Sequence, residues 1–135
     1  MNWIGVVAAL TAFFSIWFGH VAVRKVESIS PKLWIPSTIF VVLGLVVEFL
    51  SLSTASRPLS AALGILGITL LWDAIEFTRQ QRRIIKGHAP ANPNNPRHAK
   101  ILEKYATATT QDLLKRDPVG YLVSTDEITQ LVSNL

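Results

Sequence analysis

The stretch WIGVVAALTAFFSIWFGHVAV, from Trp3 to Val23, decides the fold because no residue in it is charged. A helix needs about 20 such residues to cross a hydrocarbon core roughly 30 Å thick, and this run supplies them. A cleavable signal peptide would begin with basic residues and end at small residues after a shorter apolar core, and this stretch has neither feature. We therefore expect a membrane-spanning helix that the protein retains.

A second apolar run extends from Leu33 to Leu52, after the break at Ser30-Pro31. Trp34 lies at its start, and Trp is the type of residue that lies at membrane interfaces. The only charge in the run is Glu48. Its length and composition predict a second membrane-spanning helix.

The third run, Leu59 to Trp72, follows Pro58, which favours the first turn of a helix. Its apolar part is short, so we expect the helix to continue until Gly87, a residue suited to ending helices. The sequence thus predicts an all-α fold with a three-transmembrane-helix bundle over residues 1–87. A Pro/Asn-rich linker over 88–96 and a short helical cytoplasmic tail over 97–135 complete the expected domains.

The composition supports a membrane protein and excludes several chemistries. Hydrophobic residues make up 50% of the chain and charged residues 16%, and the apolar residues gather in the first half instead of alternating with polar ones. The chain has no cysteine, which excludes disulfides, thiolate metal sites and cysteine nucleophiles. No nucleophile with a base, phosphate-binding loop or metal set is evident, so we do not expect an enzyme.

Basic residues in the short flanks predict the orientation of the helices. The first loop carries Arg24, Lys25 and Lys32, whereas the second carries only Arg57, and the segment after the third helix is the most basic. We therefore expect a multi-pass protein of the cell inner (plasma) membrane, with its N-terminus outside and its C-terminus in the cytoplasm.

Ionisable residues near the membrane are the candidate functional residues, because charges within the bilayer are costly. At the inner interface we expect a polar cluster of His20, Asp73, Glu76 and Arg79. It would act either as a proton relay or ligand site, or as hydrogen bonding that fixes helix packing. At the outer interface we expect a pair between Glu48 and Arg57.

His20 also raises the question of haem or chlorin ligation. The turn before it offers no recess of small residues for a macrocycle, and no second histidine lies at membrane depth. His20, His88 and His98 also lack the spacing of metal ligands on one helix turn. We therefore predict no cofactor and no metal.

Four basic residues follow the third helix and form a basic collar: Arg79, Arg82, Arg83 and Lys86. Each contributes about 1 kcal/mol of attraction to anionic lipid headgroups, although every helix that ends inside needs such an anchor for its topology alone. Nucleic-acid binding would want a second basic patch with exposed aromatic residues, which is not evident.

The tail carries apolar residues but too few for an independent core. We expect one helix from Pro96 to about Ala106 and a second opened by Thr109. The expected residues for docking on a partner are Ile101, Leu102, Tyr105, Leu113, Leu114, Tyr121, Ile128 and Leu131.

At Phe18-Gly19-His20 and Lys86-Gly87-His88-Ala89-Pro90 the chain resembles an uncharacterised bacterial and archaeal family of short integral membrane proteins of unknown function. That family carries Phe-His-Pro and Gly-Trp-Phe-Pro motifs. Here Val21 stands where the first motif has proline, and the tail extends past the resemblance. The resemblance implies the membrane architecture and no known catalysis.

The sequence leaves two functions to weigh. The first is a non-catalytic accessory or anchoring subunit, whose partners are other subunits of a membrane complex and anionic lipid headgroups. Small residues such as Gly44 and Gly67 give helix faces that pack either within the bundle or against a partner. The second is a small oligomeric transporter or proton-conducting protein that uses the interfacial His, Asp and Glu residues.

Overall fold

The structure is a computed structural model of the 135-residue chain and describes residues 3–112. Three long helices, α1 (Ile4–Ile29), α2 (Trp34–Ser53) and α3 (Arg57–Ile85), are followed by the short helix α4 (Pro96–Lys104). Each of the three long helices is long and apolar enough to cross a membrane. The predicted all-α fold, with three candidate spans and a short helix after them, is confirmed.

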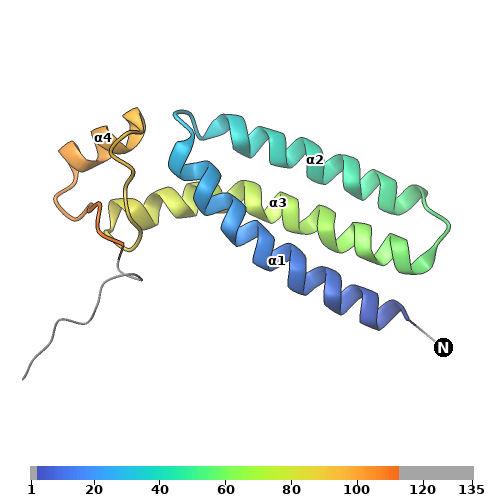
Figure 1. The fold of residues 1–135 in the computed structure, drawn as a ribbon. Coiled ribbons are helices and arrows are strands. Elements are labelled where there is room, and N and C mark those ends of the chain that lie inside the picture. Colours follow the sequence, from blue (N-terminus) through green and yellow to red (C-terminus); the bar gives the residue numbers. More distant parts are fainter. Residues whose placement is uncertain (1–2, 113–135) are drawn as a thin grey trace, which may run out of the picture.

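Helix α3 is the central element of the bundle, because it packs against both α1 and α2. Figure 1 shows the three helices side by side, with α3 extending beyond the others toward α4. The 29 residues of α3 measure about 44 Å, which exceeds a hydrocarbon core of about 30 Å. The last turns of α3 therefore project past the membrane-spanning part and carry the rest of the chain.

Small residues set the close contact between α2 and α3. A methyl group added at Gly44 would lie 3.1 Å from the backbone oxygen of Gly67 and 2.8 Å from the Leu71 side chain. Nearer the loop, Ser51 Oγ donates to the Ser60 carbonyl (2.8 Å) while Ser60 Oγ donates to the Ser51 carbonyl (2.9 Å). These small residues thus pack within the bundle, as is usual for helices in lipid.

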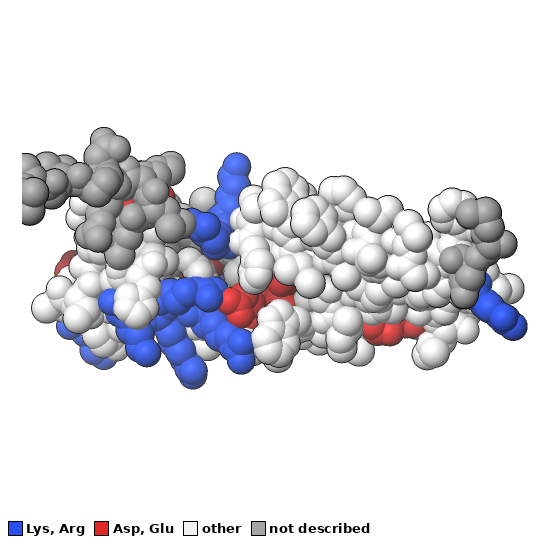
Figure 2. All heavy atoms as spheres, turned by 90° about the horizontal axis from the view of Figure 1, so that it is seen from below, with Lys and Arg blue, Asp and Glu red and all other residues white. Residues whose placement is uncertain are grey.

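Burial is concentrated at one end of the bundle. Along most of its length large apolar side chains are open, with Phe13 65% and Trp17 60% exposed, whereas Val23 and Phe77 are buried near the α4 end. Figure 2 shows the same division: basic side chains gather near the α4 end, and the remaining length is almost entirely uncharged. We call the end that carries α4 the basic end.

The segment between α3 and α4, expected as a Pro/Asn-rich linker, packs against the rest of the protein. Helix α3 ends as expected, with Gly87 in the left-handed region (φ 74°), but the chain then folds back onto the bundle. Ala89 and Ala91 are buried, and the Ala91 N–H donates to the Thr109 carbonyl at 2.8 Å. Proline and asparagine here end a helix but do not keep the chain away from the protein.

The tail agrees with the sequence in its first helix only. Helix α4 ends at Lys104, close to the expected limit, whereas residues 109–112 are not helical. The remainder of the second expected helix lies outside the described residues. So do five of the expected docking residues: Leu113, Leu114, Tyr121, Ile128 and Leu131.

Candidate functional site

A buried polar network joins the end of α1 to the segment around α4, and we call it the α1 clamp. Its members are Glu27 on α1 together with Asn92, Asn95, Arg97 and His98. Glu27 and His98 are both fully buried, at 0% exposure. Sequence reasoning missed this network, whose contacts with the end of α1 join residues 64 to 71 positions apart.

The carboxylate of Glu27 is the centre of the α1 clamp. Its Oε1 accepts from Arg97 Nη1 at 2.7 Å and lies 3.1 Å from His98 Nε2. The Asn92 backbone N–H donates to His98 Nδ1 at 2.8 Å, so the ring proton must be on Nε2, where it points at Glu27. The clamp therefore fixes the tautomer of His98 as well as its position.

The same segment also caps the C-terminal end of α1, whose last carbonyls have no partner within the helix. Asn92 Nδ2 and Asn95 Nδ2 both donate to the Ser28 carbonyl at 3.0 Å, and Asn95 Nδ2 also donates to the Ser30 carbonyl at 3.0 Å. Arg97 Nη2 donates to the Glu27 carbonyl at 2.7 Å. Asn95 in addition begins α4, since its Oδ1 accepts from the Arg97 N–H.

A small apolar cluster lies next to the α1 clamp and consists of Ile84, Ala89, Ala91 and Ile101. Leu102 and Tyr105 pack against it and are partly buried. Ile101 is only 6% exposed, so it does not present a surface to another protein. Ile101 therefore packs α4 against α3 within this chain, whereas docking of the partly buried Leu102 and Tyr105 on a partner stays a prediction.

The residues of the expected inner polar cluster lie on neighbouring faces of α1 and α3. Asp73 is buried against the backbone of Gly19, where an added methyl group would lie 2.9 Å from Asp73 Oδ1. His20 and Asp73 line one cavity of about 330 Å³. Glu76 is buried and pairs with Arg83 and, at 3.8 Å, with Arg79.

Arginines of the basic collar have different surroundings. Arg83 bridges Glu76 and Gln80, because its Nε donates to Gln80 Oε1 at 2.9 Å. The Arg79 guanidinium lies over the Trp72 ring, 4.7 Å from its centroid, in a cation–π contact. Arg82 and Lys86 are exposed.

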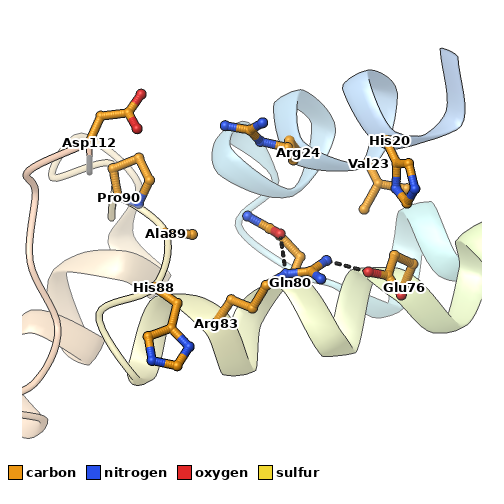
Figure 3. A pocket seen from close by; sticks show the side chains of 10 residues that line it. All are labelled: His20, Val23, Arg24, Glu76, Gln80, Arg83, His88, Ala89, Pro90 and Asp112. Atoms are coloured by element: carbon orange, nitrogen blue, oxygen red, sulfur yellow. Dashed lines mark hydrogen bonds and ion pairs between the residues drawn. The ribbon is translucent and has the colours of Figure 1, made fainter. Parts of the chain in front are cut away.

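A cavity of about 630 Å³ opens between α1, α3 and the segment after α3 at the basic end. Figure 3 shows Arg24 and His20 on its α1 side, and Glu76, Gln80 and Arg83 on its α3 side. The remaining lining residues are Val23, His88, Ala89, Pro90 and Asp112. Two guanidinium groups, Arg24 and Arg83, and two imidazoles, His20 and His88, thus line one cavity.

The expected outer pair of Glu48 and Arg57 is not formed. Among residues 3–112, no ion pair joins them, and Glu48 instead lies against Gly67 of α3, where an added methyl group would be 2.7 Å from Glu48 Oε1. Gly67 is ten residues, about 15 Å of helix, from Arg57. The carboxylate is therefore much farther from the Arg57 end of the bundle than residue counting predicts, because the α2 side chain reaches back along its helix.

Within residues 3–112 there is no group of three or more His, Asp or Glu side chains that is suited to hold a metal ion. His98 and Glu27, which are in direct contact, are engaged in the α1 clamp. One signal of the clamp was present in the sequence, since Asn95-Pro96 is a typical helix start. The contact with Glu27 had no local signal.

Three apolar helices joined to a polar, basic end define a small multi-pass membrane protein. The chain belongs to the family described as Domain of unknown function (DUF4491), whose model matches residues 2–95. The matched region contains the three long helices, Glu27 and both asparagines of the α1 clamp, but not Arg97 or His98. Neither the curated proteins nor the solved structures contain a match to the chain.

Proposed function

We propose that this protein is a non-catalytic accessory subunit that anchors within a larger membrane complex through its helix faces. The observation that carries the proposal is the position of Glu48. Its carboxylate lies against Gly67, and within the described part of the chain it makes no hydrogen bond or ion pair. A partner in another chain would satisfy it.

Because Glu48 lies deep in the membrane-spanning part, a polar group of another protein best explains how its carboxylate is satisfied. Gly67 is ten residues from Arg57 and twelve from Arg79, or about 15 Å and 18 Å of helix, which is the middle of a core about 30 Å thick. A charged side chain at that depth costs on the order of 3 kcal/mol on insertion scales. Such residues almost always face another protein group or a water-filled cavity.

Within residues 3–112 the basic residues flank the membrane-spanning part and do not reach the depth of Glu48. Arg57 begins α3, and the others on this helix begin at Arg79. A neighbouring helix that carries a basic or amide side chain at mid-membrane would supply the missing donor. We also retain as proposals the inner membrane location, with the N-terminus outside and the C-terminus in the cytoplasm.

A second candidate, a small oligomeric transporter or proton-conducting protein, draws support from His20. This histidine lines one cavity with Asp73 and the neighbouring cavity with Glu76. Asp73, however, faces α1 at Gly19, whereas Glu48 reaches α3 from α2. A proton path that used both carboxylates would require several copies of the protein side by side. This function therefore ranks second.

Site-specific photo-crosslinking in native membranes tests the accessory-subunit proposal. A photoreactive residue at Leu45, one helical turn before Glu48, shares its side of α2, whereas one at Leu50 points away at nearly the same depth. We expect Leu45 to crosslink to one membrane protein and Leu50 to give no such product. Glu48→Leu should abolish the Leu45 product, because it removes the group that the partner satisfies.

A full-length protein that is monodisperse and monomeric in mild detergent, with equal crosslinking from both positions, would contradict the proposal. Proton flux in liposomes made with the purified protein alone, lost in both Glu48→Gln and Asp73→Asn, would favour the second candidate instead. Glu103→Gln is the matched control, because it also removes one carboxylate but at an exposed position of α4.

A further inference from the structure

Helices α1 and α3 lie parallel and in register along one groove. Ser15 Oγ lies 3.3 Å from Thr69 Oγ1, and Gly19 contacts Asp73, so both contacts join residues that are 54 positions apart. Two successive contacts with the same offset mean that the helices run in the same direction at matching depth. Residues near the same level on the two helices therefore line the groove together.

The α1 side of this groove is formed by Ile16, His20 and Arg24. They are spaced four residues apart and so share one face of the helix. The sequence of side chains is apolar, then imidazole, then guanidinium, toward the basic end. Ile16 and His20 line the smaller cavity, and His20 and Arg24 line the larger one.

The α3 side is likewise apolar first and basic toward the basic end, without an imidazole. Ile68 and Trp72 line the smaller cavity, and Arg83 lines the larger one, with Arg79 stacked on Trp72 between them. These positions also share one face of their helix. Thr69 and Asp73 also line the smaller cavity, so this part of the groove is mostly apolar but holds one buried carboxylate. Arginines lie where the membrane-spanning part ends.

Within residues 3–112, two guanidinium groups, Arg24 and Arg83, and two carboxylates, Glu76 and Asp112, line the larger cavity. Within residues 3–112 no ion pair involves Arg24. Glu76, the carboxylate on the α3 side, is already shared by Arg79 and Arg83. Figure 3 shows Asp112 next to Pro90, across the cavity from Arg24, whose guanidinium is directed toward that side. A guanidinium has five N–H donors, so Arg24 and the remaining donors of Arg83 are available to an anion between α1 and α3.

We infer that this groove binds an anionic phospholipid, with the headgroup phosphate between Arg24 and Arg83 and an acyl chain along Ile16, Ile68 and Trp72. Anionic headgroups are attracted to basic residues at this level of the membrane, and His20 lines both cavities, so the two lie next to each other along the groove. The apolar half distinguishes a lipid from free phosphate, which would use the basic half alone. The inference does not depend on the accessory-subunit proposal.

Lipid retention by the full-length protein tests the site. The protein is reconstituted in nanodiscs of phosphatidylcholine with a minor fraction of phosphatidylglycerol, extracted in mild detergent, and analysed by mass spectrometry for bound lipid. We expect phosphatidylglycerol to be retained above its bulk fraction. Arg24→Gln should lower the affinity about tenfold, the effect of losing one charge-assisted hydrogen bond.

The matched control is Arg82→Gln, which removes the same charge from the basic collar at a position that does not line the cavity. It should leave retention unchanged. Equal losses in the Arg24 and Arg82 variants, or no enrichment in the wild type, would overturn the site, because unspecific attraction to the collar would then explain the binding.

Ile68→Trp separates a lipid from free phosphate. Filling the apolar half should reduce phosphatidylglycerol retention while leaving any binding of inorganic phosphate unchanged. If Ile68→Trp has no effect and inorganic phosphate at millimolar concentration displaces the lipid completely, the ligand is phosphate and the lipid assignment is wrong.

Discussion

Along the apolar length of the bundle, α1–α3 meet through glycines and a few serines and leave Phe13 and Trp17 exposed. At the basic end, by contrast, Glu27 and His98 are fully buried, and residues far apart in sequence are joined by hydrogen bonds and ion pairs. The surroundings explain the difference. In lipid, apolar side chains need no protein cover, whereas at the interface the helix ends and charges require polar partners.

The two regions should therefore be destabilised by different kinds of substitution. The apolar length depends on close backbone approach, so added volume harms it. The basic end depends on paired polar groups, so removing one partner harms it. The four changes below test this division, beginning with the largest expected effect.

Glu27→Ala should detach the basic end while leaving the apolar length intact. It removes the acceptor of Arg97 and His98, and breaking a buried ion pair by removing one partner costs about 3–5 kcal/mol. Hydrogen exchange should accelerate from Ala89 to Ile101 and stay unchanged in α2.

Two variants control that experiment. Glu103→Ala, on the exposed side of α4, should leave exchange as in the wild type. Glu27→Ala combined with Arg97→Ala should be less harmful than Glu27→Ala alone, because no unpaired guanidinium remains near the helix end. Faster exchange throughout α2 in Glu27→Ala would show that the two parts are not separable.

Gly44→Val should destabilise the apolar length. Its side chain would meet the Leu71 side chain and, at 3.1 Å, the backbone oxygen of Gly67, which cannot move aside independently of α3. Overpacking of this kind costs about 1–3 kcal/mol. Unfolding in detergent mixtures, followed by circular dichroism, measures the change.

Gly5→Val is the matched control for Gly44→Val, since nothing lies within 4 Å of a side chain added at Gly5. Gly5→Val should change the stability of the isolated protein very little. A loss of stability as large as that of Gly44→Val would indicate a general effect of valine and not the α2–α3 contact.

Gly87→Ala should weaken the basic end by about 1–2 kcal/mol, because φ there is 74°, a left-handed value that costs other residues this amount. The added methyl group would also collide with the Thr107 carbonyl oxygen. Limited proteolysis should cut after α3 faster than in the wild type. An Ala substitution at exposed Lys86, one residue earlier, serves as the control and should leave the rate unchanged.

Ser51→Ala should have the smallest effect. It removes the hydrogen bond to the Ser60 carbonyl but retains the reciprocal bond from Ser60, and such bonds between membrane helices average about 0.6 kcal/mol. Detergent unfolding should register a slight loss. A loss above that of Gly44→Val would mean that hydrogen bonding, and not close packing, holds α2 against α3.

The sequence by itself determined the three membrane-spanning helices, since a long uncharged run has few alternatives in lipid, and Pro58 and Gly87 mark where α3 begins and ends. Only the tertiary structure decided the partners of the charged residues. Glu48 lies against Gly67 and not Arg57, because the direction of a side chain along its helix shifts its depth by more than residue counting allows.

The sequence likewise did not predict the α1 clamp or the burial of Ile101 against α3. A pair such as Glu27 and His98 leaves no periodic signal, because its two members belong to elements separated by most of the chain. Proline and asparagine showed that α3 had to stop before Pro96 but not that the chain would then return to cap α1. Local rules of helix formation act within a few residues, whereas burial and hydrogen bonding over such separations are settled only when the helices pack.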